Sequence, residues 1–273
     1  MTAPALVLLA DGSAEPSSTQ VAHALRKRMQ ELRPGLSIHL AFLADCAPTP
    51  QQVVSTLIAR GVQEAVFVPL DITHATEAPP AVNEAMRRIH AAHPGWHASL
   101  ARPLGPACEL LSILDLRLRQ ALSASHTMEL DGLVLSAVDG GDPRGSALLA
   151  RRARQWKAHH RLPVQLAFGD QAGHGIGAAI GALRTQGRRL IAVGSFYLSN
   201  DHAFAEQAEQ ALALGAVAVS APIGADERLL DLAMARYSVA ALGLLDDEEP
   251  PVREEADTEE SAPRDQPPRL VAL

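Results

Sequence analysis

The sequence has few cysteines, few lysines and no long apolar run. Cys46 and Cys108 are its 2 cysteines, far apart and outside any CxxC pair, so neither a disulfide framework nor a cysteine metal cluster is indicated, and we expect two buried free thiols. The apolar runs are only as long as a strand, and no basic segment precedes the first of them. We therefore expect no membrane span, no secretory signal and a cytoplasmic protein.

Several nucleotide and acyl-transfer motifs are also missing. There is no GxxxxGK[ST] phosphate loop and no G-x-S-x-G motif, and Lys27 and Lys157 are the only lysines, which argues against ATP use and against a serine nucleophile. The segment GHGIGA at 173–178 fits the dinucleotide fingerprint on paper. It does not follow the first strand of its unit, however, so we interpret it as the start of a helix.

Negative charge is distributed unevenly along the chain. The formal net charge is -7, and residues 246–269 account for all of it with ten acids and three arginines. This proline-rich stretch has too few apolar residues to offset the entropy of ordering, which predicts a disordered, solubilising tail from Asp246 onward. The rest of the chain is neutral with scattered arginines, so we expect no nucleic-acid partner.

The chain contains two copies of one unit. The stretch LVLLADGSAEP at 6–16 aligns with LVLSAVDGGDP at 133–143, and LIARGVQEAVFV at 57–68 aligns with LRTQGRRLIAVG at 183–194. Such pairs occur in the same order in both halves, as expected of an internal duplication. We predict three parts: an N-terminal domain over 1–126, a C-terminal repeat over 127–245 and a tail over 246–273.

Each unit alternates short apolar runs with segments of helical periodicity. Continuous apolar strands between helices indicate a parallel sheet covered on both faces, so we predict an α/β fold of two tandem four-stranded, three-layer domains. In the first unit the predicted strands are 5–9, 37–43, 65–70 and 97–101, and the predicted helices are 19–32, 50–60, 80–92 and 108–122.

Polar residues gather where the predicted strands end, which is where open parallel sheets bind ligands. The first strand leads into Asp11, Gly12 and Ser13, and the third is followed by His74 and Glu77. Imidazole and carboxylate together suit zinc, iron, cobalt or nickel. A structural explanation also stands: Asp11 caps the next helix or closes a turn, and His74 is a loop histidine. Four further histidines are expected at the surface: His90, His93, His159 and His160.

Several stretches resemble the CbiX/SirB-type sirohydrochlorin chelatases, which are ATP-independent class II tetrapyrrole chelatases. LVLLADGSAEP is similar to the family's opening LLVGHGSRDP, and RGVQEAVFVPLDITHATEAPPAV is similar to the family segment around VPL. Both ARPLGPACELLSIL and SAPIGADERLLDLA resemble the signature APPLGPDPLLAELL. The order and duplication of these stretches over about residues 5–240 are similar to those of the longer members, in which two halves are fused.

The resemblance also implies site residues. Family members use two histidines, one in GHGS and one after VPL. The second corresponds to His74 if the loop is about three residues shorter, whereas Asp11 stands in place of the first and is followed by the matching Gly12 and Ser13. Val138 takes that place in the second half, which resembles a structural partner. The resemblance thus implies that His74 and Asp11 are catalytic residues and metal ligands, and that Gly12 and Ser13 bind substrate.

The implied activity is the insertion of Co²⁺ or Fe²⁺ into sirohydrochlorin or a related tetrapyrrole. We expect no cofactor beyond this divalent metal substrate and no partner beyond the tetrapyrrole; the oligomeric state is left open. An aspartate is a weaker base than a histidine unless burial raises its pKa. Two alternatives therefore stand: a catalytically degenerate member that binds tetrapyrrole or metal as carrier or regulator, and an unrelated metal-dependent enzyme on a similar sheet.

Overall fold

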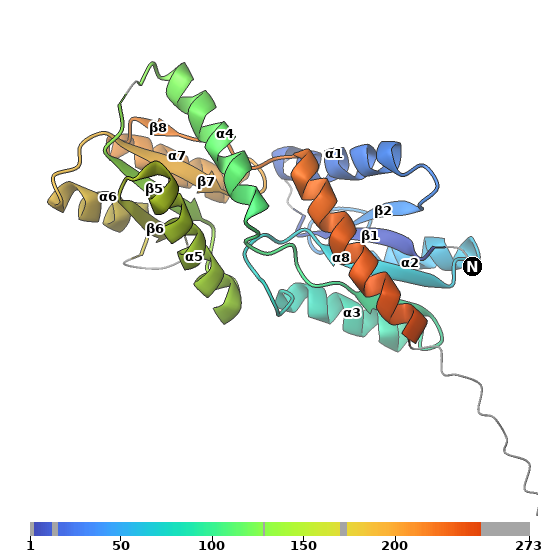
Figure 1. The fold of residues 1–273 in the computed structure, drawn as a ribbon. Coiled ribbons are helices and arrows are strands. Elements are labelled where there is room, and N and C mark those ends of the chain that lie inside the picture. The colour runs from blue at the N-terminus through green and yellow to red at the C-terminus, as the bar shows by residue number, and fades with distance from the viewer. Residues whose placement is uncertain (1–2, 13–15, 128, 170–173, 247–273) are drawn as a thin grey trace, which may run out of the picture.

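The chain forms two lobes, each built on a four-stranded parallel sheet, in a computed structural model (Figure 1). The structure describes residues 3–12, 16–127, 129–169 and 174–246. The first sheet has the order β2-β1-β3-β4 and the second the order β6-β5-β7-β8. Both sheets therefore reverse strand order beside their first strand. The predicted acidic tail beyond residue 246 and the predicted substrate-binding Ser13 lie outside the described residues.

The elements follow the same order in both lobes. The first lobe's strands are β1 (Ala5–Ala10), β2 (Ile38–Phe42), β3 (Glu64–Pro69) and β4 (His97–Leu100), and the helices of the first repeat are α1 (Pro16–Leu32), α2 (Pro50–Ala59), α3 (Pro80–Ala92) and α4 (Glu109–Ala124). The second repeat contains β5 (Gly132–Ala137), α5 (Pro143–His160), β6 (Val164–Phe168), α6 (Ile176–Thr185), β7 (Ile191–Phe196), α7 (His202–Ala213), β8 (Ala218–Val219) and α8 (Glu227–Asp246).

The predicted α/β class and the two four-stranded parallel sheets are confirmed. The strands are apolar on both faces; in β1 the five residues Ala5–Leu9 are all buried, as in a sheet covered by helices on both sides. The GHGIGA segment leads into a helix as expected, because Gly175 is the N-cap residue of α6. The helix α1 begins three residues before the predicted start, at Pro16, since proline is tolerated in the first turn of a helix.

The last helix of each repeat packs on the sheet of the other repeat (Figure 1). Helix α4 lies against β7 and β8, and α8 lies against β3 and β4. The exchange is fixed by polar contacts as well: the Tyr237 hydroxyl on α8 donates to the Pro4 carbonyl at 2.7 Å, and Arg236 donates to the Pro103 and Leu104 carbonyls at 3.1 Å. The repeat boundary near residue 126 stays a prediction about sequence, while the spatial lobes share their helices.

The cores reflect this exchange. One apolar cluster contains residues of both sheets together with α1, α4, α5 and α8, whereas the opposite face of each sheet has a cluster of its own. Because the shared cluster includes fully buried side chains from both repeats, such as Leu25 and Trp156, burial of apolar surface holds the lobes together.

Two expectations drawn from composition have different outcomes. None of the described helices is long and apolar enough to cross a membrane. The expectation of two buried thiols is wrong: Cys46 is half-buried, and Cys108 is exposed just before α4, where its thiol lies 3.4 Å from a Glu109 carboxylate oxygen. Helix α4 packs through residues such as Leu110 and Ile113, while Cys108 and Glu109 at its start remain exposed.

Candidate functional site

A cleft of about 180 Å³ lies between the carboxyl ends of the two sheets. Its walls come from the segments that follow β1, β3, β5 and β7, so both lobes contribute to it. The polar and charged side chains that line it are Asp11, Asp71, Thr73, Tyr197, Ser199 and Asp201. The cleft is where the strand order predicts a ligand site, and three carboxylates on its walls favour a cation over an anion.

Asp11 stands at the end of β1 and lines this cleft. Asp11 is exposed on one side, but protein atoms crowd its carboxyl, and this desolvation raises the pKa of that carboxyl. The negative charges of Asp71, Asp139 and Asp201 raise that pKa further, and His74 opposes them. A bound cation would relieve this repulsion.

Asp71 holds His74 in place. One Asp71 carboxylate oxygen, Oδ1, accepts the backbone N–H groups of Thr73 at 2.9 Å and His74 at 2.6 Å, and Oδ2 lies 3.2 Å from His74 Nδ1. The hydrogen bond with Asp71 raises the pKa of His74, against a smaller opposing effect of burial. A carboxylate on Nδ1 assigns the hydrogen to that atom, which leaves Nε2 of the neutral ring free to accept a proton or bind a metal ion.

His74 and Asp11 line different cavities. His74 lines an adjoining cavity with Glu77, Asn83 and Asp142, whereas Asp11 lines the cleft. No hydrogen bond or ion pair found within the described ranges joins Asp11 to His74, although each feels the charge of Asp71. The structure therefore brings His74 together with Asp71 and makes Asp11 an electrostatic neighbour of that pair; joint metal ligation by Asp11 and His74 stays a prediction.

The second lobe clamps the loop that follows His74. Asp142 is the N-cap of α5, and its carboxylate accepts the N–H groups of Gly145 at 2.6 Å, Ala75 at 3.1 Å, and Thr76 and Glu77 at 2.8 Å. Burial alone would raise its pKa, but the four backbone donors outweigh that effect and lower the pKa to about 2. An ionised carboxylate from one lobe thus orders the loop that follows His74 in the other lobe.

The close approach of the two loops depends on glycine. A Cβ atom on Gly145 would lie 2.0 Å from the Thr73 carbonyl oxygen, and one on Gly141, which has a φ of +62°, would lie 2.4 Å from the same atom. In the first lobe, Gly12 has a φ of +82°, and a Cβ there would lie 2.1 Å from the Ala44 carbonyl oxygen. Gly12 lines the cleft, and its absent side chain lets the Asp11 loop pack on the loop after β2.

A third cavity, of about 240 Å³, opens beside the same loop and is lined by arginines. Arg102, Arg144, Arg152 and Arg236 come from the loop after β4, from α5 and from α8, and meet next to Ala75 and Thr76. Burial and the nearby charge of Arg102 lower the pKa of Arg236. A cavity with four guanidinium groups favours anions, and carboxylates match the geometry of arginine well.

Sequence reasoning missed the roles of Asp71 and Asp142. Asp71 lies shortly after β3, and its spacing of three residues from His74 is the sequence signal for an Asp–His pair. Asp142 precedes Pro143, a pattern typical of a helix start, which predicts the N-cap but not the three donors from the first lobe. Asp201 lines the cleft and also caps α7, accepting the N–H of Phe204 at 2.9 Å.

Several solved structures share this two-lobed α/β architecture. SirB from Bacillus subtilis with Fe³⁺ has a TM-score of 0.73 and 17% identity, over 89% of this chain and 98% of that one. The sirohydrochlorin chelatase SirB from Bacillus subtilis subspecies spizizenii in complex with cobalt has a TM-score of 0.72 and 17% identity, over 88% and 96%. CbiX, the terminal enzyme for biosynthesis of siroheme in denitrifying bacteria, has a TM-score of 0.58 and 17% identity, over 87% and 99%.

The sequence points to the same group. Residues 5–121 match the CbiX family model, and the chain as a whole shares the fold of the SirB and CbiX structures. No curated protein matches the sequence significantly. The resemblance drawn from the sequence motifs is thereby confirmed. The matched region contains Asp11 and His74 and ends within α4, before the second repeat begins.

Proposed function

We propose that this protein inserts Co²⁺ or Fe²⁺ into sirohydrochlorin or a related tetrapyrrole without ATP. The observation that carries the proposal is the Asp71–His74 pair beside the acidic cleft, in a chain whose residues 5–121 match the CbiX family model. The solved relatives include a sirohydrochlorin chelatase in complex with cobalt and a SirB structure with Fe³⁺.

The residues suit the chemistry of metal insertion. Two pyrrole N–H protons must leave the macrocycle as a divalent ion sheds water and enters it. In the proposed reaction, His74 Nε2 accepts a proton while Asp71 holds the imidazole through Nδ1 and stabilises the imidazolium that results. Asp11 acts as a metal ligand or as the second base, and its raised pKa makes it a better base than an ordinary aspartate.

The arginine-lined cavity gives the macrocycle a second point of attachment. Sirohydrochlorin is anionic because its ring bears carboxylate side chains, and a guanidinium can bind a carboxylate through two hydrogen bonds. The cavity borders Ala75 and Thr76, directly after His74. Carboxylates held there would orient the ring without occupying the acidic cleft, which stays available for the metal ion.

A second function is favoured by Asp11 itself. The resemblance places a histidine at this position, and an aspartate there supports a member that binds a tetrapyrrole or a metal ion as carrier or regulator without turnover. This alternative uses the same cleft and the same arginines, and it differs only in the fate of the two pyrrole protons.

The test is an insertion assay with purified full-length protein, sirohydrochlorin and Co²⁺ or Fe²⁺, followed by the absorbance change of the macrocycle. The proposal expects acceleration over the uncatalysed rate, and loss of that acceleration in His74→Ala but not in His90→Ala, an exposed histidine on α3. If the wild type binds sirohydrochlorin without turnover and Asp11→His gains turnover, the carrier function is correct. Absence of both binding and turnover refutes both.

A further inference from the structure

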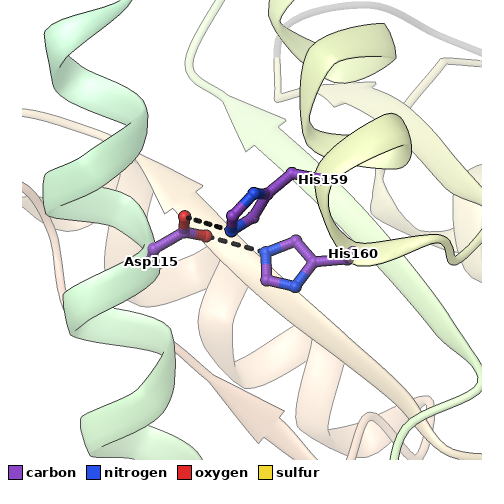
Figure 2. A group of neighbouring side chains, drawn as sticks. All are labelled: Asp115, His159 and His160. Atoms are coloured by element: carbon purple, nitrogen blue, oxygen red, sulfur yellow. Dashed lines mark hydrogen bonds and ion pairs between the residues drawn. The ribbon is translucent and has the colours of Figure 1, made fainter.

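Three metal-ligating side chains meet on the helical surface of the second lobe, away from the cleft. Asp115 on α4 faces His159 and His160 at the end of α5 (Figure 2). The Asp115 carboxylate oxygens lie 2.8 Å from His160 Nε2 and 3.7 Å from His159 Nε2. His160 is only a quarter exposed, so the expectation of two plain surface histidines holds for His159 alone.

The spacing of the donor atoms suits one ion. One ligand atom of each residue lies within 4.8 Å of the other two. Around a tetrahedral ion bound at about 2.0–2.1 Å, ligand atoms stand roughly 3.3 Å apart, which falls between the two measured separations. The exposed His159 ring can adjust by rotation, and water completes the coordination. Binding requires His160 to carry its hydrogen on Nδ1, so that Nε2 presents its lone pair.

The carboxylate is held in place and lacks an ordinary counter-ion. Asp115 is 9% exposed, and its Oδ1 accepts the indole N–H of the fully buried Trp156 at 2.5 Å. Within the part of the chain that the structure describes, the ion-pair partners of Asp115 are His159 and His160, with no lysine or arginine among them. A nearly buried carboxylate that is fixed by a buried tryptophan offers a dication both charge and a preset geometry.

We propose that Asp115, His159 and His160 form a second divalent metal site, suited to Zn²⁺, Co²⁺ or Ni²⁺. Two imidazoles and one carboxylate are a donor set that these ions favour. The site is distinct from the cleft: α5 has 18 residues and begins beside the cavity of His74, so its length of about 27 Å separates the two. An ion there links α4 of the first repeat to α5 of the second and stabilises the helix exchange.

The test measures metal binding where the cleft cannot contribute. Full-length protein carrying Asp11→Asn and His74→Ala is stripped with a chelator and titrated with Zn²⁺ by calorimetry, and with Co²⁺ by its visible absorption. In this background we expect one tight site, an absorption typical of four-coordinate Co²⁺ with nitrogen and oxygen ligands, and a melting temperature that rises with Zn²⁺.

Single substitutions in the same background identify the ligands. His159→Ala removes an exposed ring and should weaken binding at least tenfold; Asp115→Asn should do the same while its amide oxygen still accepts the Trp156 N–H. His126→Ala, at an exposed turn after α4, is the matched control and should change nothing. Absence of a tight site, or binding unaffected by His159→Ala, overturns the proposal and leaves an Asp–His hydrogen-bond network.

Metal insertion is measured separately, in the chain that carries His159→Ala as its only substitution. Its insertion activity should equal that of the wild type, so failure of the second metal site and failure of the proposed function can be told apart.

Discussion

The two lobes have the same sheet order but differ in what their strand ends carry. After β1 and β3 the first lobe presents Asp11 and the Asp71–His74 pair, whereas the aligned ends of β5 and β7 present Val138 and Tyr197. The second lobe contributes Asp142, whose carboxylate fixes the loop of the first. The Asp–His pair thus lies in the first lobe, and the second lobe supports the loop that contains it.

The lobes also differ in how they fill equivalent core positions. Leu8 pairs with Val68 in the first sheet and Leu135 pairs with Gly194 in the second, so Val68 and Gly194 are equivalent. In the second lobe the Trp156 ring of α5 lies against Gly194; Met29 of α1 aligns with Trp156 in the repeat, and both side chains are buried. The second lobe thus combines a large ring with a glycine where the first has a methionine and a valine, which keeps the combined side-chain volume of the two positions similar.

Removing the imidazole of His74 should have the largest effect. We expect His74→Ala to lower the rate of metal insertion by roughly 10²-fold or more, because a positioned general base contributes about 10²–10⁴-fold. The equivalent residue of the second lobe is the exposed Asn200, and Asn200→Ala should leave the rate within about twofold, since a solvent-exposed side chain gives the reaction no base. Initial rates at saturating metal check this; equal losses in both variants would contradict the assignment of chemistry to the first lobe.

Substitutions at Gly194 and Trp156 test whether the side-chain volumes at these two core positions compensate for each other. Gly194→Val should destabilise the protein by about 3 kcal/mol, because a Cβ at this position already lies 2.4 Å from the Trp156 ring. Adding Trp156→Met should restore part of that loss, though not all, since it also removes the hydrogen bond to Asp115. Urea unfolding of the wild type, both single variants and the double variant gives the coupling free energy; purely additive effects would mean that the two positions do not compensate.

Titrating Asp142 should weaken the contact between the lobes. Its pKa of about 2 lies below the ordinary 3.8, so the ionised form stabilises the folded state above pH 4, and the stabilisation is lost as pH falls from about 4 towards 2. The difference corresponds to about 2 kcal/mol. We expect Asp142→Asn to lower the free energy of unfolding at pH 7 by about this amount. The same change should reduce the pH dependence of that free energy between about pH 4 and pH 2. Denaturant titrations between pH 2 and pH 7 measure both; an unchanged pH dependence would show that another carboxyl dominates.

The smallest expected effect is a shift in the pH dependence of the insertion rate, through the pKa of His74. The hydrogen bond with Asp71 raises the pKa of His74, and the neutral ring is the form that accepts a proton. Asp71→Asn should lower that pKa and move the acid limb of the rate profile to lower pH, while Glu77→Gln, an exposed carboxylate on the same loop, should leave the limb in place. An acid limb that Asp71→Asn does not move would mean that His74 is not the titrating base.

Much of the fold could be predicted from local patterns. The first lobe's predicted strands end within one residue of the observed ones, because continuous apolar runs bounded by glycine, proline and acids leave little choice of strand position. Helix α3 was predicted at its observed bounds, Pro80–Ala92, since two prolines precede it and a histidine and a proline follow it. Helical periodicity over 108–122 predicts α4, but it does not predict the sheet against which α4 packs.

The sequence alone determined the α/β class with its two four-stranded sheets, and it predicted an internal repeat and a site at the ends of the first lobe's strands. These features depend on periodicity and on residue types close together in the chain. Tertiary structure decided which distant groups meet. The Asp142 carboxylate accepts hydrogen bonds from N–H groups 65 to 67 residues away, and Asp115 contacts histidines about 45 residues later in the chain. Helices α4 and α8 each pack on the sheet of the other repeat. These long-range contacts arise because the two repeats bury one shared core. No local sequence pattern specifies which of the two similar sheets a helix will cover.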